Sequence, residues 1–311
     1  MYKNTAIHVV IPAYNEERFI GQVLSSLPGY VDKIIVVDDC STDDTFRVAT
    51  ASVDSRVVVI KTAHNCGIGE AMCLGYQRAL DLGGEVLVKM DGDGQMAPEH
   101  LALLLDALIE KGYDYAKGNR FLHSEAINQM PAARITGNIV LTFLTKAASG
   151  YWHIFDPQNG YTAIRAEALR SIALEKLDRQ FFFENDMLVR LNIHNFRVTD
   201  VAMPARYGQE TSDLRISKIL ITFPPLLLRR FMYRILHKYI LRNFSPVALF
   251  FLLGLPMFLW GAFFGIYLWI RSTVTGEPTH TGGIMLALVP IVLGFQLLLQ
   301  AIVLDIQETP R

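Results

Sequence analysis

The chain has 311 residues, of which 51% are hydrophobic and 19% are charged, and its formal net charge is −1. Globular domains usually carry about 25% charged residues, so this chain is poor in charge. Its apolar content excludes a largely disordered protein, and its net charge gives no electrostatic basis for binding nucleic acid. The cysteines Cys40, Cys66 and Cys73 are too few and too irregular for a disulfide framework or a cysteine zinc site, which favours reduced thiols.

The first part of the chain alternates short apolar runs with segments of helical character. The apolar runs predict strands over residues 7–11, 34–37, 57–60 and 86–90, and the segments between them predict helices over 17–27, 43–52 and 69–82. Such alternation is typical of βαβ units with a parallel sheet that is covered on both faces. Farther along, the pattern predicts a long helix over 127–149, strands over 161–164 and 197–203, and a helix over 184–194 between them. We therefore predict one α/β domain with a mostly parallel sheet over residues 1–212.

Polar clusters follow the first four predicted strands at their carboxyl ends. They span residues 12–17, 38–45, 65–69 and 91–95. Ligands of open parallel sheets bind at the carboxyl ends of the strands. One such cluster is commonly just a helix cap, but four at successive strand ends predict a binding site.

The last cluster, Asp91-Gly-Asp93-Gly-Gln95, has the strongest chemical character. Hard oxygen ligands at this spacing can hold Mg²⁺ or Mn²⁺ that bridges a diphosphate. The alternative is an acidic turn that caps a helix beginning near Pro98. A calcium-binding EF-hand loop starting at Asp91 is excluded, because its twelfth position would be Ala102 rather than Glu.

These four motifs, in this order, resemble the family 2 glycosyltransferases of the GT-A fold, and the resemblance covers roughly residues 5–210. It implies an inverting transferase that uses a nucleotide-diphospho-sugar and a divalent metal, Mg²⁺ or Mn²⁺. Carried over by position, it implies that the nucleotide sugar is bound by Pro12, Tyr14, Glu16, Asp39, Asp91 and Arg206. It likewise implies that the metal is held by Asp91, Asp93 and Gln95, with Asp93 among the catalytic residues.

The chain also resembles the polyprenyl-phosphate sugar synthases, such as the dolichol-phosphate mannosyltransferases. Gly67-Ile68-Gly69 is similar to their Gly-Leu-Gly, Gly118-Asn119-Arg120 is similar to their Gly-Ser-Arg, and Arg206 matches a loop that closes over the nucleotide diphosphate. Arg134 falls on the predicted long helix, where these synthases place a second acceptor-phosphate arginine. Two arginines at one site suit a phosphate acceptor, because guanidinium groups bind phosphate through paired hydrogen bonds. One departure is Asp156-Pro-Gln-Asn-Gly-Tyr161, which replaces the more usual Asp-x-x-Ser-Gly-Phe.

Asp186 lies where the family places acidic residues near the acceptor. With a sugar hydroxyl as acceptor, Asp186 would be the general base, whereas an ionised lipid phosphate has no proton to remove and Asp186 would orient groups. We predict transfer of the sugar to polyprenyl phosphate, and the alternative is transfer to a glycan or glycolipid hydroxyl. A non-catalytic membrane protein with a degenerate nucleotide-binding domain is disfavoured, because Asp91-x-Asp93-x-Gln95 is intact.

The last third of the chain is strongly apolar. Two uncharged stretches predict transmembrane helices over residues 243–271 and 281–304, since about 20 apolar residues span a bilayer. The alternative is a pair of buried helices in a soluble core. Residues 213–242 are predicted to form basic amphipathic interfacial helices, because Arg230, Arg234, Lys238 and Arg242 recur every four residues. Basic flanks stay cytoplasmic, so we predict an integral membrane protein with two spans and a cytoplasmic catalytic domain.

Overall fold

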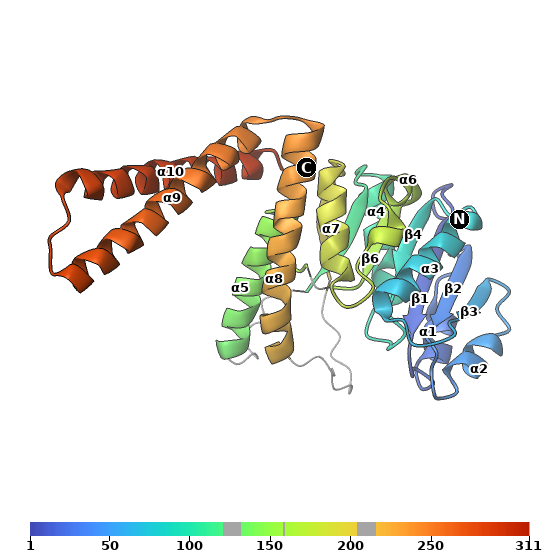
Figure 1. The fold of residues 1–311 in the computed structure, drawn as a ribbon. Helices are drawn as coiled ribbons and strands as arrows, with labels where there is room; N and C mark the ends of the chain where they lie inside the picture. The colour runs from blue at the N-terminus through green and yellow to red at the C-terminus, as the bar shows by residue number, and fades with distance from the viewer. Residues whose placement is uncertain (121–131, 158, 204–215, 311) are drawn as a thin grey trace. The chain divides into compact units, whose positions relative to one another are not determined.

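The computed structural model describes residues 1–120, 132–157, 159–203 and 216–310, and within these it does not describe the side chains of 132–138 and 216–221. The chain divides into two compact units, the first essentially Met1–Phe231 and the second Met232–Thr309. Figure 1 shows the chain coloured from its N-terminus to its C-terminus.

The first unit is built on one sheet, whose seven strands lie in the order β3-β2-β1-β4-β6-β5-β7. Their bounds are β1 Ile7–Ala13, β2 Lys33–Asp38, β3 Val57–Lys61, β4 Val86–Lys89, β5 Tyr115–Asn119, β6 Thr162–Arg165 and β7 Val198–Ala202. β6 runs antiparallel to both β4 and β5, and the other pairings are parallel. The predicted α/β fold with a mostly parallel sheet is confirmed.

Helices connect these strands along the chain, and α8 follows the last strand. Their bounds are α1 Ile20–Ser26, α2 Thr45–Thr50, α3 Ile68–Asp81, η1 Pro98–His100, α4 Leu101–Ile109, α5 Ala132–Ser149, α6 Ala166–Ser171, η3 Leu174–Lys176, α7 Phe183–Ile193 and α8 Ile216–Arg234. The helices predicted between the first four strands are present, and the predicted long helix 127–149 is seen as α5, with 127–131 outside the described residues. α6 and β5 are additional elements that the sequence analysis does not predict, whereas η1 and α4 form the helix mentioned near Pro98.

The sheet lies between two layers of helices. Val9 and Ile11 of β1 pack in one buried apolar cluster with α1 and α4. Val10, between them on the same strand, packs in a second cluster with α3, α6 and α7. Successive side chains of a strand point to opposite faces, so this alternation makes a three-layer α/β/α unit. Because β1 to β4 are parallel, their carboxyl ends and the polar motifs after them share one edge of the sheet.

The second unit contains a π-helical segment, η4 (Ile235–Arg242), and two long helices, α9 (Pro246–Thr275) and α10 (Thr281–Gln307). Both long helices are long and apolar enough to cross a membrane, judged by length and composition. They form a hairpin (Figure 1) and approach closely through small residues, because a Cβ on Gly261 would lie 2.5 Å from the Ala287 carbonyl oxygen. Close approach through small residues is typical of helix pairs within membranes.

The second unit also holds a buried ion pair at the base of its hairpin. The guanidinium of Arg234 lies 2.5 and 2.9 Å from the two carboxylate oxygens of Asp305, and the Tyr239 hydroxyl donates to the same carboxylate at 2.5 Å. Arg234 is fully buried, and burial lowers the pKa of the neighbouring Lys238 to about 8. Of the basic residues predicted to recur every four positions, Arg234 therefore binds a carboxylate inside the protein, and that carboxylate comes from the end of α10.

Candidate active site

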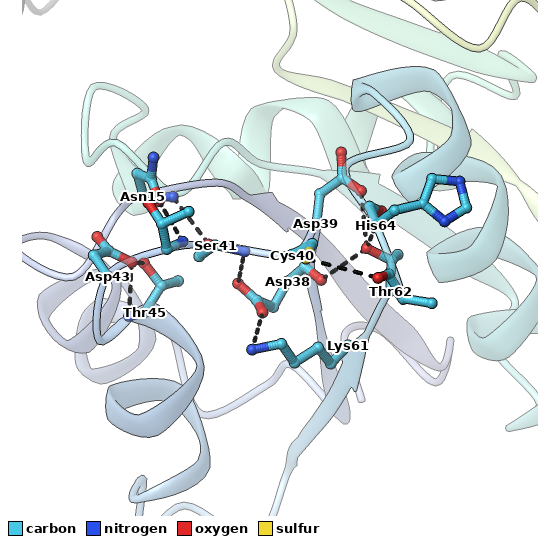
Figure 2. A network of polar contacts seen from close by, with 12 residues as sticks. Asn15, Asp38, Asp39, Cys40, Ser41, Asp43, Thr45, Lys61, Thr62 and His64 are labelled. Carbon is cyan, nitrogen blue, oxygen red and sulfur yellow. Dashed lines mark hydrogen bonds and ion pairs between the residues drawn. The ribbon is translucent and has the colours of Figure 1, made fainter.

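The carboxylate of Asp39, directly after β2, holds the turn that begins α3. Its oxygens accept a hydrogen bond from the Thr62 hydroxyl at 3.0 Å (Figure 2). They also accept hydrogen bonds from the backbone N–H groups of Cys66 and Gly67 at 2.8 Å each. Asp39 is buried, and Gly67 has a φ of 92°, a backbone conformation that favours glycine. Asp39, expected to face the nucleoside, therefore also fixes the glycine turn beside it.

The loops that follow β1 and β2 are hydrogen-bonded to each other. The backbone N–H of Asn15 donates to the Ser41 hydroxyl at 3.0 Å (Figure 2). The Asn15 side-chain oxygen accepts from the Thr42 N–H at 2.9 Å. The N–H of Glu16 donates to the Thr45 hydroxyl at 2.7 Å, while the Tyr14 side chain stays 47% exposed. The structure thus places the expected nucleotide-binding residues Pro12, Tyr14, Glu16 and Asp39 at one edge of the sheet.

The Asp91–Gln95 motif follows β4, which pairs with β1. A Cβ on Gly92 would lie 3.4 Å from Cγ of Glu16 and 3.5 Å from the Pro12 carbonyl oxygen. The Asp93 carboxylate accepts a hydrogen bond from the Gln95 N–H at 2.9 Å. The structure therefore brings Asp91, Asp93 and Gln95 beside the β1 loop.

A buried lysine under this motif was missed by the sequence analysis. The Lys89 ammonium lies 2.7 Å from the Asp91 carboxylate and 3.2 Å from that of Glu184, on α7. Burial alone would lower the pKa of Lys89, but the two carboxylates outweigh it and raise the pKa above its ordinary value. A lysine inside the apolar strand Val-Leu-Val-Lys was the available signal.

The oxygen atoms of the Asp91–Gln95 motif suit a divalent metal whose remaining ligands come from a substrate and from water. Across the part of the chain that the structure describes, no group of three or more His, Cys, Asp or Glu residues is arranged to hold a metal ion. Mg²⁺ needs no such cage, because it is usually bound by one or two carboxylates together with substrate phosphates and water. Two carboxylates and an amide oxygen fit that pattern.

Arg120, after β5, is held by a buried carboxylate. Its Nε and Nη2 lie 2.8 and 3.1 Å from the two oxygens of Asp156, and its backbone N–H donates to the same carboxylate at 3.2 Å. The Asp156 side chain is 1% exposed, whereas that of Arg120 is 44% exposed. The expected acceptor arginine therefore lies at the surface and is held by the buried Asp156. The sequence analysis did not predict this role for Asp156.

The loop that carries Asp156 is fixed from beneath by Lys117 of β5. The fully buried Lys117 ammonium donates to the Asn159 carbonyl, and the Asn159 side-chain oxygen accepts from the Tyr161 N–H at 2.9 Å. Burial lowers the pKa of Lys117 to about 8, although Glu184 and Asp156 act in the opposite direction. Lys117 is a second buried cation that the sequence analysis missed.

Asp186, near the start of α7, is fully buried and bound to two arginines. One carboxylate oxygen accepts the Asp178 N–H at 3.0 Å and lies 2.9 Å from Nη2 of Arg230 and 3.4 Å from Nε of Arg190. Burial raises the pKa of Asp186, and the two guanidinium groups counteract that rise. These contacts occupy one carboxylate oxygen, Oδ2, whereas Oδ1 is buried and has no hydrogen-bond partner among the described residues.

Two expected site residues cannot be placed. The backbone of Arg134 belongs to α5, but its side chain is not described, and Arg206 lies outside the described residues. The roles of both remain predictions.

Comparison with known proteins identifies the family. Residues 8–173 match the family described as glycosyl transferase family 2. The chain belongs to this family. It is therefore a glycosyltransferase, as the motifs predict.

Characterised relatives share most of their length with the chain. It is 35% identical to polyprenol monophosphomannose synthase of Mycolicibacterium smegmatis, over 68% of this chain and 80% of the relative. It is 28% identical to UDP-N-acetylglucosamine–dolichyl-phosphate N-acetylglucosaminyltransferase of Methanococcus voltae, over 70% of this chain and 92% of the relative.

A solved structure supports the fold. Glucosyl-3-phosphoglycerate synthase of Mycobacterium tuberculosis, crystallised with Mn²⁺, UDP and glucosyl-3-phosphoglycerate, superimposes with a TM-score of 0.54 at 22% identity. The match covers 74% of this chain and 80% of that one. The likeness confirms the GT-A fold.

Proposed function

We propose that this glycosyltransferase moves a sugar from a nucleotide-diphospho-sugar, GDP- or UDP-linked, to polyprenyl phosphate. The names of two relatives support this acceptor, since one is a polyprenol monophosphomannose synthase and the other acts on dolichyl phosphate. The motifs for the donor and the arginines for an anionic acceptor lie in the same unit of this chain.

The environment of Asp186 is the observation that carries the choice of acceptor. A sugar hydroxyl needs a general base within hydrogen-bond reach of its proton. Asp186 is fully buried, and two arginines, Arg190 and Arg230, lie within 3.4 Å of its Oδ2, which also accepts the Asp178 N–H. A phosphate acceptor is ionised at neutral pH and needs no such base, which agrees with a structural Asp186.

On the acceptor side, the reaction brings the anionic lipid phosphate close to the anionic diphosphate of the donor. Arg120 and Arg134 would bind the lipid phosphate and offset its charge, so that a phosphate oxygen can attack the anomeric carbon with inversion. Asp156 holds the Arg120 guanidinium by two contacts and so restricts its orientation. Phosphate binding to an arginine restrained in this way loses less side-chain entropy.

On the donor side, Pro12, Tyr14, Glu16 and Asp39 would bind the nucleoside, and Arg206 would close over the diphosphate. Asp91, Asp93 and Gln95 would hold Mg²⁺ or Mn²⁺. When bound, such an ion supplies positive charge that stabilises the leaving nucleotide diphosphate. Its use here is supported by the fold neighbour, which was crystallised with UDP and with Mn²⁺ or Mg²⁺.

The apolar hairpin supports a location at the membrane, where a polyprenyl phosphate is found. α9 and α10 would be the two spans, and the basic residues before α9 would keep the catalytic domain in the cytoplasm. The segment 213–242 would lie at the interface.

The test is a transfer assay with membranes that contain the full-length protein, a panel of labelled GDP- and UDP-sugars, and two matched acceptors. Polyprenyl phosphate and the unphosphorylated polyprenol differ in the phosphate alone. We expect product with the phosphate and none with the polyprenol. Equal product from the alcohol would contradict a phosphate acceptor. Transfer to a glycan or glycolipid hydroxyl that Asp186→Asn abolishes would establish the alternative instead.

A further inference from the structure

A continuous set of hydrogen bonds joins α8 to the donor edge of the sheet. α8 is the helix through which the chain leaves the first unit, and Arg230 lies on its last turns. Its guanidinium is 2.9 Å from the Asp186 carboxylate, and that carboxylate accepts the Asp178 N–H at 3.0 Å. The side chain of Arg230 is 19% exposed, so this contact is largely shielded from water.

The loop that begins at Asp178 is joined in turn to the glycine turn at the start of α3. The Arg179 carbonyl accepts the Glu70 N–H at 3.2 Å, and the Gln180 side-chain amide donates to the Cys66 carbonyl at 3.2 Å. Arg179 also pairs with the Glu70 carboxylate. The fit is tight, because a Cβ on Gly69 would lie 2.2 Å from the Asp178 carbonyl oxygen.

The same turn is bound on its other side by Asp39. The N–H groups of Cys66 and Gly67 both donate to the Asp39 carboxylate at 2.8 Å. Arg230 and Asp39 are therefore joined through Asp186, the 178–180 loop and the 66–70 turn. A shift of α8 would therefore be transmitted to Asp39, which is expected to bind the nucleoside.

We propose that Arg230 is a positioning residue for the donor site: through Asp186 and the 178–180 loop it fixes the Cys66–Glu70 turn against Asp39. The link to nucleotide affinity rests on the proposed function, whereas the link between Arg230 and the turn does not. Coupling energies along such networks correspond to about 2- to 30-fold changes in affinity.

The chain offers a matched control for this proposal. Arg229 is the preceding residue on the same helix and is exposed, so Arg229→Gln removes the same charge without touching Asp186. Arg230→Gln removes the contact, and Arg230→Lys retains the charge but loses the planar fork.

The experiment measures hydrogen exchange and nucleotide binding on the full-length protein in detergent. Without nucleotide, we expect Arg230→Gln to speed amide exchange in peptides that cover residues 62–73 and 174–182, with Arg229→Gln unchanged from wild type. With UDP and GDP as probes in the presence of Mn²⁺, we expect Arg230→Gln to weaken binding by roughly 2- to 30-fold and Arg230→Lys to weaken it less.

Hydrogen exchange and nucleotide binding distinguish failure of the positioning role from failure of the proposed donor. If Arg230→Gln exchanges like Arg229→Gln in both peptides, and binds nucleotide equally well, the positioning role is wrong. If the wild-type protein binds neither UDP nor GDP, the proposed donor is wrong, and the exchange data alone decide whether Arg230 fixes the turn. A loss of far-UV circular dichroism in Arg230→Gln alone, with Arg230→Lys folded and wild-type in both readouts, would reduce Arg230 to a stability role and also overturn the proposal.

Discussion

Asp156 and Arg120 form a two-contact ion pair in which the carboxylate is buried and the guanidinium is at the surface. Nε and Nη2 of the arginine lie 2.8 and 3.1 Å from the two carboxylate oxygens. The orientation of the arginine is thereby set from inside the protein. On the proposed function, loss of the Asp156 carboxylate should therefore weaken acceptor binding through Arg120.

Asp156→Asn is expected to reduce transfer by about 10- to 100-fold, because a charge-assisted hydrogen bond contributes roughly 1.5–3 kcal/mol. The loss should arise in the acceptor dependence and leave nucleotide affinity unchanged. Steady-state kinetics with polyprenyl phosphate and nucleotide sugar varied separately measure this. Asp54→Asn is the control, since Asp54 forms a similar pair with Arg56 in the loop before β3. Unchanged acceptor kinetics in Asp156→Asn would contradict the role of the pair.

Asp93→Asn is expected to lower both Mn²⁺ affinity and transfer while the protein still folds. Loss of residues that merely support a metal ligand costs 10- to 100-fold, so a ligand itself should cost at least about 100-fold. Titration with Mn²⁺ and the transfer assay are the measurements, and the exposed Glu99→Gln is the control. Full activity of Asp93→Asn, or of the wild type in excess chelator, would exclude the metal site.

Lys89→Met is expected to destabilise the first unit by about 3–5 kcal/mol, because it leaves the buried Glu184 carboxylate without its cation. The double variant Lys89→Met/Glu184→Gln should recover part of that loss. Urea unfolding measures both. Lys3→Met, which removes an exposed lysine paired with Asp106, should cost about 1 kcal/mol or less. Equal stability of Lys89→Met and the wild type would show that the ion pair contributes nothing.

Lys117 predicts a pH dependence of stability with a definite sign. Its pKa is about 8 in the folded protein and near 10.5 when unfolded, so between these values the unfolded chain binds more protons. The free energy of unfolding should therefore rise as the pH goes from about 8 to 10.5. This gain should be lost as the pH falls back to about 8. Unfolding midpoints at a series of pH values, for wild type and Lys117→Met, isolate this contribution. A difference between the two that does not vary with pH would contradict the low pKa.

The first 90 residues illustrate what sequence pattern predicts well. The continuous apolar strand 34–37 is buried on both faces, so composition alone marks it, and the polar motif after it falls at its end by topology. β5 is harder, because Tyr-Ala-Lys-Gly-Asn contains a lysine, a glycine and an asparagine that read as a loop. It is a strand because neighbours β6 and β7 pair with it, and its lysine is buried beneath a loop.

In the candidate site, too, some residues are predictable from the sequence and others depend on how the chain packs. Asp91, Asp93 and Asp39 stand in motifs, and chain order suffices to predict that they share one edge. Partners such as Asp156 for Arg120 and Arg230 for Asp186 lie 36 and 44 residues apart, and nothing local marks them. Pairings of this kind depend on how β6, α7 and α8 pack, which no periodicity encodes.

The buried pair between Arg234 and Asp305 constrains how the two long helices pair with each other. One partner precedes the first long helix and the other stands at the end of the second, so the pair can form only when the chain has gone out and come back. If the second helix were displaced lengthwise against the first, the buried Arg234 guanidinium would lose its carboxylate, and an unpaired buried charge costs several kcal/mol. On the proposed membrane location, this pair would therefore favour a hairpin whose second helix has returned in the correct register.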